Sequence, residues 1–126
     1  MPGLCLYAGG ALAAKLAGVA AFTLAWTHSI EKIPWEEDWR VTPAGLVLVE
    51  ARVKGMGAGM EPPPEAVLAD GFWRWAPRVP PLPEVVLRRA GVTDDWRLCA
   101  EGRCQPMGEL APGDADPVTM KPCEPG

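Results

Sequence analysis

The amino-acid sequence predicts an all-β protein, an antiparallel β-sandwich or small barrel-like domain of about eight short strands. Its 126 residues include 15 prolines and 14 glycines, a density that interrupts long helices and favours short strands joined by tight turns. Several runs alternate hydrophobic and polar positions, which is typical of half-buried strands. Turn signals separate these runs at regular spacing. We expect residues 1–126 to form a single domain, with a Pro/Gly-rich acidic C-terminal extension from about residue 106.

The apolar N-terminal segment allows two interpretations. A membrane-spanning helix needs about 20 consecutive apolar residues, but Gly9-Gly10, Lys15 and Gly18 interrupt this stretch. Alternation favours strands instead, because alternate positions would then share one face, namely Phe22, Leu24, Trp26 and His28. We therefore expect three strands, at residues 4–8, 12–16 and 19–29.

The same rules predict the later strands. Pro43-Ala44-Gly45 is a turn between two of them, and Asp70-Gly71 is a hairpin turn between two others. Between residues 46 and 53 the alternation predicts that one face carries Val47, Val49, Ala51 and Val53, and that the other carries Glu50 and Arg52. The strands are expected at residues 39–42, 46–53, 66–69, 72–76, 84–90, 96–100 and 118–121.

Charge and the start of the chain limit the partners and the compartment. A net charge of −4 argues against nucleic-acid binding, which needs clustered Lys and Arg. Met1-Pro2-Gly3-Leu4 has no basic side chain, so no signal peptide is recognisable. An even cysteine count favours an oxidising compartment, the cell envelope or periplasm. The localisation stays open, as does membrane contact, though not through a clear transmembrane helix.

The four cysteines predict disulfides more strongly than zinc. If Glu101-Gly102 forms a two-residue turn, Cys99 lies opposite Cys104, where a cross-strand disulfide is geometrically reasonable. Cys5 and Cys123 could join the two ends of the chain, although sequence alone cannot fix the connectivity. Zinc usually requires two tight pairs of thiolates, which the spacing does not offer. Free buried thiols are the remaining alternative.

The residues around the only histidine form the candidate site. His28 with Glu31 and Glu36 could bind a metal or small ligand, or act as an acid–base pair in a hydrolase. The structural alternative is that the imidazole caps the edge of the core, bonded to a carboxylate or carbonyl. No catalytic residue, metal ligand or cofactor is assigned. The candidate binding residues here are His28, Glu31, Glu36, Trp26, Trp35 and Trp39.

A glycine-rich loop supplies the other candidate binding residues, Gly57, Gly59 and Met60. A phosphate-binding loop needs a following Lys-Ser or Lys-Thr and a helix N-terminus. Prolines follow here instead, so we expect a flexible surface or binding loop.

Three segments carry a resemblance to a known family. Residues 22–32, 35–39 and 57–60, in that order, resemble a bacterial family with a domain of unknown function, whose genes often lie beside TRAP-type transporters of the TAXI class. The similarity covers most of the chain, from Leu4 to about Cys104. It implies a β-rich, non-enzymatic accessory or binding protein associated with a solute transport system, with transporter subunits as partners. It supplies no catalytic residues.

Overall fold

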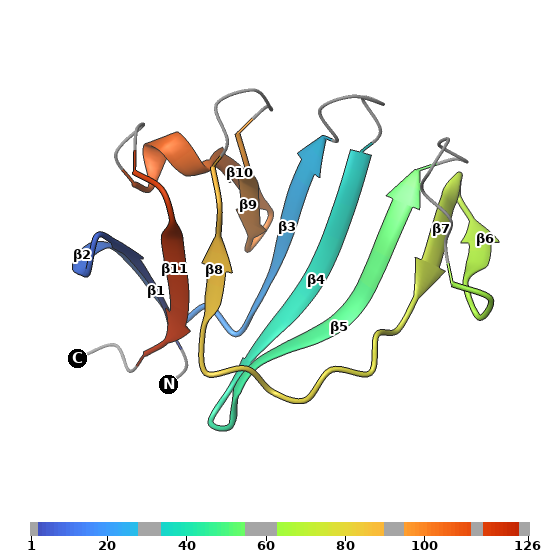
Figure 1. Ribbon diagram of the computed structural model, residues 1–126, viewed down its shortest axis with the longest axis horizontal. Helices are drawn as coiled ribbons and strands as arrows, with labels where there is room; N and C mark the ends of the chain where they lie inside the picture. Colours follow the sequence, from blue (N-terminus) through green and yellow to red (C-terminus); the bar gives the residue numbers. More distant parts are fainter. Residues whose placement is uncertain (1–2, 28–33, 55–62, 90–94, 112–114, 124–126) are drawn as a thin grey trace.

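The structure is a computed structural model that describes residues 3–27, 34–54, 63–89, 95–111 and 115–123. Within these residues the fold is all-β with two antiparallel sheets, which confirms the predicted fold class (Figure 1). The small sheet has the strand order β2-β1-β11-β8, and the large sheet has the order β10-β9-β3-β4-β5-β7-β6. The elements are β1 (Gly3–Ala8), β2 (Ala11–Ala17), β3 (Ala21–Thr27), β4 (Pro34–Thr42), β5 (Gly45–Lys54), β6 (Val67–Ala69), β7 (Phe72–Trp75), β8 (Val85–Leu87), β9 (Arg97–Ala100), β10 (Arg103–Pro106), the 3-10 helix η1 (Met107–Glu109) and β11 (Val118–Pro122).

The apolar N-terminal segment forms strands, as the alternation predicts. β1 and β2 make a hairpin in the small sheet, and β3 crosses to the large sheet. Gly9 and Gly10 have φ angles of 62° and 84°, so they supply the left-handed backbone that the two-residue turn requires. In the part of the chain that the structure describes, no helix is long and apolar enough to cross a membrane.

β4 is longer than the sequence predicts. It begins at Pro34 rather than at Trp39, so the acidic run lies inside the strand and not before it. Aromatic pairs with β3 offset the poor strand propensity of acidic residues. Trp26 stacks on Trp35 with ring centroids 5.8 Å apart, and Phe22 stacks on Trp39 at 6.3 Å. In total the described residues form eleven strands rather than about eight.

A β-bulge in β5 changes the predicted alternation. Asp38 of β4 pairs with Glu50, whereas the next residue, Trp39, pairs with Leu48. Val49 is therefore the extra residue on β5, and 38% of it is exposed. One extra residue puts the side chains before and after the bulge in opposite alternation phases. The prediction that Val47, Val49, Ala51 and Val53 share one face is therefore wrong.

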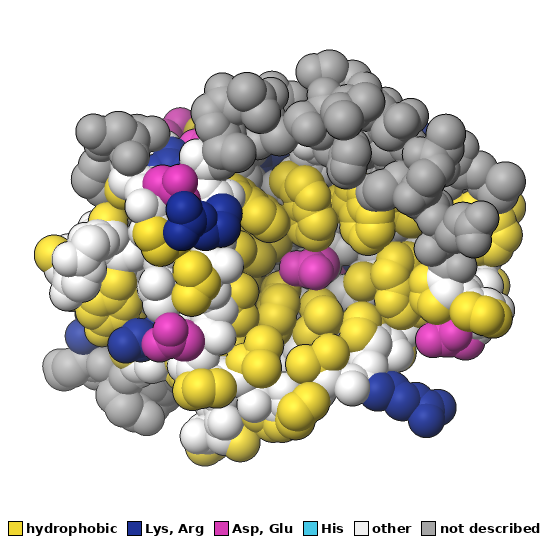
Figure 2. Space-filling model, in the orientation of Figure 1, with side chains coloured by type: hydrophobic (Ala, Val, Ile, Leu, Met, Phe, Trp, Pro, Cys, Tyr) yellow, Lys and Arg dark blue, Asp and Glu magenta, His cyan; other side chains and the backbone are white. Residues whose placement is uncertain are grey.

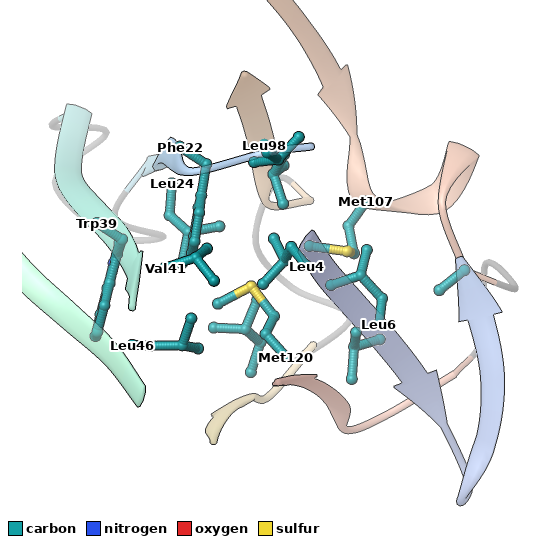
Figure 3. Packing of buried hydrophobic residues seen from close by; sticks show 14 residues of the cluster. Leu4, Leu6, Phe22, Leu24, Trp39, Val41, Leu46, Leu98, Met107 and Met120 are labelled. Carbon is teal, nitrogen blue, oxygen red and sulfur yellow. The ribbon is translucent and has the colours of Figure 1, made fainter. Parts of the chain in front are cut away.

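The hydrophobic core lies between the small sheet and one face of the large sheet (Figure 3). β1 supplies Leu4 and Leu6, and the large sheet supplies Leu24 and Leu46; all four are fully buried. The segment after residue 106, which the sequence analysis treats as an extension, adds two fully buried methionines, Met107 of η1 and Met120 of β11. β11 is hydrogen-bonded on both sides, to β1 and to β8.

Both expected cysteine pairs are disulfides. Cys5 of β1 is bonded to Cys123, just after β11, with the two Cα atoms 5.9 Å apart. Cys99 and Cys104 face each other across the β9–β10 hairpin, with Cα atoms 3.9 Å apart. The intervening turn has left-handed φ angles at the two central residues, 52° and 78°, as a two-residue hairpin turn requires. The two bonds use all four cysteines, so no thiol is left for zinc.

Gly45, at the start of β5, is required by its surroundings. The connection from β7 to β8 crosses this end of the large sheet, where Leu46 and Leu82 exchange hydrogen bonds of 2.7 and 2.9 Å (Figure 1). Gly45 has a φ angle of +133°, and a Cβ atom added there would lie 2.5 Å from the carbonyl oxygen of Leu82. That distance is far below van der Waals contact, and the two hydrogen bonds with Leu46 hold the backbone of Leu82 in place.

Replacing Gly45 by alanine is expected to lower the free energy of unfolding by roughly 2–3 kcal/mol, from backbone strain and from displacement of the crossing segment. Urea denaturation measures the change. Gly71→Ala is the matched control, because Gly71 has a φ angle of +81° but nothing within 4 Å of the added Cβ. It should cost only about 1 kcal/mol. Equal losses in the two variants would contradict a role for the close approach.

Candidate functional site

The two faces of the large sheet differ in chemistry. Side chains alternate along β4, so Trp35, Glu37 and Trp39 lie on the face that also bears the core, and Glu36 and Asp38 lie on the opposite face. The acidic run is thereby divided between an apolar face and a polar face. The neighbouring strands β3 and β5 contribute side chains to both faces.

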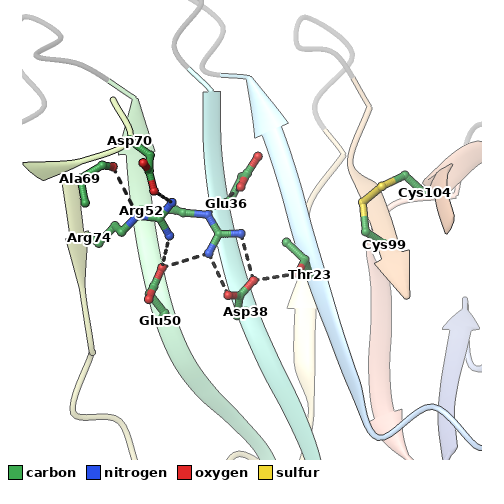
Figure 4. A network of polar contacts seen from close by, with 10 residues as sticks. All are labelled: Thr23, Glu36, Asp38, Glu50, Arg52, Ala69, Asp70, Arg74, Cys99 and Cys104. Atoms are coloured by element: carbon green, nitrogen blue, oxygen red, sulfur yellow. Dashed lines mark hydrogen bonds and ion pairs between the residues drawn. A yellow bond between two sulfur atoms is a disulfide. The ribbon is translucent and has the colours of Figure 1, made fainter. Parts of the chain in front are cut away.

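The polar face carries an ion-pair network around Arg52 of β5 (Figure 4). Its Nε donates to Glu36 at 2.6 Å, and its two terminal nitrogens donate to Asp38 at 2.8 and 3.1 Å. Glu50 accepts from Arg52 at 3.1 Å and from Arg74 of β7 at 2.8 Å. Only 12% of the Arg52 side chain is exposed. Two arginines thus form ion pairs with three carboxylates across β4, β5 and β7.

Local charge controls ionisation in this network. Burial alone would raise the pKa of Asp38, but hydrogen bonds from Arg52 and Thr23, together with the charges of Arg52 and Arg74, bring that pKa below its ordinary value. The hydroxyl of Thr23 donates to Asp38 at 2.7 Å. The bond to Asp38 is the largest cause that raises the pKa of Arg52, with Glu36 adding to it. These groups stay charged and hold neighbouring strands together, which is a structural role.

A row of tryptophans crosses the apolar face of the large sheet. Trp26 of β3 lies between Trp35 of β4 and Trp96, with ring centroids 5.8 and 4.7 Å away. Trp35 also meets Trp75 of β7 edge-on, at 6.3 Å and an interplanar angle of 85°. Trp26, Trp35 and Trp75 are half-buried and are not part of the core between the sheets. The aromatic surface therefore continues beyond the region that the small sheet covers.

The small sheet covers only one side of the apolar face. It lies toward β9 and β3 and covers the start of β5 at Leu46, but it leaves β7, β6 and the part of β5 that pairs with β7 without a facing sheet (Figure 1). Figure 2 shows hydrophobic side chains gathered over β4, β5 and β7, around a hollow with an acidic group among them. We call this surface the tryptophan face and define it by Trp26, Trp35, Glu37, Ala51, Trp73 and Trp75.

Glu37 is the acidic residue that the strand register places on this face. Its cross-strand neighbours are Leu24 on β3 and Ala51 on β5, and Trp35 and Trp39 flank it along β4. The Trp39 indole donates to the Glu37 carboxylate at 3.3 Å. Burial raises the pKa of Glu37, and the Trp39 hydrogen bond only partly offsets this. Among the described residues, no Lys or Arg forms an ion pair with Glu37.

The surroundings of Glu37 leave room and unused hydrogen-bond donors. Ala51 pairs with Glu37 on one side and with Trp75 on the other, so the smallest side chain of this row lies between the carboxylate and an indole. Two residues further along the strands, the adjacent row on the same face consists of Trp35, Val53 and Trp73. The indole nitrogens of Trp35 and Trp73 are buried and have no hydrogen-bond partner in the described part of the chain. Such donors indicate an incompletely satisfied site.

The structure separates the residues that the sequence analysis groups together. Trp26, Trp35 and Trp39 lie on the apolar face, whereas Glu36 lies on the polar face and is bonded to Arg52. His28, Glu31, Gly57, Gly59 and Met60 lie outside the described residues. Among the described residues, no group of three His, Cys, Asp or Glu side chains could hold a metal ion.

Four residues of the tryptophan face are not among the binding residues predicted from the sequence, namely Glu37, Ala51, Trp73 and Trp75. The available signal is the spacing Trp35-x-Glu37-x-Trp39, which in a strand puts all three side chains on one face. This spacing indicates a shared face only if residues 35–39 are assigned to a strand, whereas the predicted strand begins at Trp39.

The fold and site together define a disulfide-linked, all-β, two-sheet protein with an open aromatic face, on which Glu37 has no ion-pair partner among the described residues. The chain belongs to the DUF1850 family, a domain of unknown function, whose family model matches residues 22–107. That span runs from β3 to η1 and contains the whole tryptophan face. No curated protein and no solved structure matches the chain.

Proposed function

We propose that this protein is a non-enzymatic binding protein and that the tryptophan face is its binding surface. The observation that carries the proposal is the half-buried aromatic row of Trp26, Trp35 and Trp75, which extends past the region that the small sheet covers. Contiguous apolar surface of this kind is costly to leave in water and marks binding sites in soluble proteins. Tryptophan is also among the residues that contribute most to binding energy.

We further propose that the protein is an accessory component of a TRAP-type solute transport system and that a subunit of that system is its partner. Support comes from the resemblance of residues 22–32, 35–39 and 57–60 to a family whose genes often lie beside such transporters. The first two of these segments contribute β3 and β4, and therefore Trp26, Trp35 and Glu37, to the tryptophan face. A binding surface built from the family's own identifying segments fits an accessory role.

A binding role is favoured over the alternative of catalysis or metal binding by His28, Glu31 and Glu36. A general base or metal ligand needs an available carboxylate. Glu36 already accepts a hydrogen bond of 2.6 Å from Arg52, whose side chain is largely buried, and it lies on the face opposite the tryptophans. Recruiting Glu36 for chemistry would disrupt an ion-pair network that joins three strands.

Copurification with the transporter subunits of the same organism tests the proposed function. Trp75→Ala is expected to weaken retention of the subunits by about tenfold or more, because it removes a large aromatic contact from the binding surface. Val86→Ala is the control, since Val86 is an exposed apolar residue on β8 of the small sheet, and it should bind as the wild type does. Circular dichroism verifies that both variants are folded. Failure of the wild type to retain any subunit, or undiminished retention by Trp75→Ala, would overturn the proposal.

A further inference from the structure

We propose that the tryptophan face binds a small organic ammonium cation, with the charged head above Glu37 and its methyl or alkyl groups against the indole rings. This inference rests on the proposed binding function and names the chemical class of the ligand. It is drawn from the charges, the aromatic geometry and the free space around Glu37.

The two faces of β4 differ in how their carboxylates are paired. On the polar face, Glu36, Asp38 and Glu50 are all paired with arginine at 3.1 Å or less. On the apolar face, Glu37 has no cationic partner among the described residues, and its one hydrogen bond comes from the neutral Trp39 indole. A partly buried carboxylate without a counter-ion is costly, and a bound cation removes that cost. The site is thus complementary to a positive charge.

The tryptophan rings of this face lie at defined angles to one another. Trp35 and Trp75 meet at 85°, so their rings form two walls at a right angle, and Trp26 stacks on Trp35 as a second ring parallel to the first wall. Indole rings attract cations through the negative potential of their faces, and walls of this kind recognise quaternary ammonium groups. Ala51, between Glu37 and Trp75 in the strand register, keeps the space beside the carboxylate free of bulky side chains.

Other ligand classes fit these observations less well. Calcium and magnesium require several oxygen ligands, whereas this surface offers one carboxylate among apolar groups. An anion would be repelled by Glu37. A purely apolar ligand would leave the carboxylate both desolvated and unpaired, which increases the cost that burial already imposes. A methylated ammonium ion satisfies the charge and the apolar walls at once, and it loses less hydration than a primary amine.

The expected pH dependence follows from the state of Glu37. Its described neighbours are Leu24 on β3, Ala51 on β5, and Trp35 and Trp39 on β4, none of which titrates or carries a charge. Because burial raises the pKa of Glu37, the carboxylate is lost at a higher pH than for an exposed glutamate. Affinity for a cation should therefore fall as the pH is lowered through that raised pKa.

The test compares choline with its neutral isostere 3,3-dimethyl-1-butanol, which has the same shape without the charge. Calorimetric titration and tryptophan fluorescence at pH 8 measure binding of both probes to the purified full chain. We expect choline to bind the wild type about tenfold more tightly than the isostere. Glu37→Gln should reduce this preference strongly, leaving only the part that the indole rings contribute. Glu109→Gln removes the same charge from an exposed position on η1 and should leave the preference unchanged.

Two results would overturn the inference. One is that the wild type binds neither probe, or binds the two equally; this measurement needs no variant, so a folding defect cannot obscure it. The other is that Glu37→Gln, shown to be folded by its near-ultraviolet circular dichroism, retains the full preference for choline. Retention of transporter subunits that depends on Trp75 would survive either result. Loss of the ligand assignment is thereby distinguishable from failure of the proposed function.

Discussion

Replacing Cys5 and Cys123 together by alanine is expected to lower the free energy of unfolding by about 4–5 kcal/mol. The two cysteines are 118 residues apart, so their bond restricts almost the whole unfolded chain, and the entropy that it removes grows with the length of the closed loop. This is a large fraction of the roughly 5–15 kcal/mol by which a typical domain is stable. Urea denaturation of the oxidised proteins measures the difference.

The second disulfide provides the matched control. Cys99 and Cys104 are only 5 residues apart, so the same entropic reasoning gives a loss of about 2 kcal/mol for the double alanine variant. The two double variants remove the same chemical groups and differ mainly in the loop that each bond closes. A larger loss for the short loop than for the long one would show that loop length does not determine the contribution of these bonds.

Arg52→Met is expected to cost about 3–5 kcal/mol, because it leaves the carboxylates of Glu36, Asp38 and Glu50 without the cation that joins them. Arg74 still pairs with Glu50, but no other described cation pairs with Glu36 or Asp38. Arg40→Met is the control, since Arg40 is exposed on the same strand as Asp38. It should change stability by less than about 0.5 kcal/mol. Urea denaturation at pH 7 gives both values.

The same variant should show a distinct pH dependence. In the wild type the folded-state pKa of Asp38 lies below its unfolded value, so the contribution of ionised Asp38 is present above the unfolded pKa and is lost as the pH falls through the folded one. Without Arg52 the folded-state pKa of Asp38 rises, and protonation relieves the repulsion among the remaining carboxylates. The difference between Arg52→Met and the wild type should therefore shrink between pH 7 and pH 3. A constant difference would contradict an electrostatic role for Arg52.

The strand assignments were predictable where local patterns decide them. Gly9-Gly10 and Asp70-Gly71 mark hairpins whose left-handed turns depend on those residues alone, and both are present in the structure. The bulge at Val49 was not predictable in the same way. Residues 46–49 are apolar at every position, so both alternation phases look alike there and only pairing with β4 determines where the extra residue lies. β4 begins earlier than the sequence predicts because its pairing with β3 extends through the acidic run to Pro34.

The candidate site was harder to predict than the fold. Glu36 and Glu37 are adjacent and chemically identical, and local sequence cannot assign one to a network and the other to an aromatic hollow. The difference arises because Arg52 on β5 lies opposite Glu36, whereas Ala51 lies opposite Glu37. Trp75 reaches the same face only through the pairing of β7 with β5. Non-local strand register, rather than residue type, therefore creates the site.

The pairing of β1 with β11 has a consequence for how the chain acquires its fold. β11 lies between β1 and β8, so the β1–β2 hairpin cannot be joined to β8 until residues 118–122 are available. During synthesis, β1 therefore has one unpaired edge until residues 118–122 have been made. Until then Leu4 and Leu6, which are fully buried in the folded protein, are not covered by β11. Assembly of the small sheet therefore requires residues 118–122, and the Cys5–Cys123 bond then links β1 covalently to the residue that follows β11.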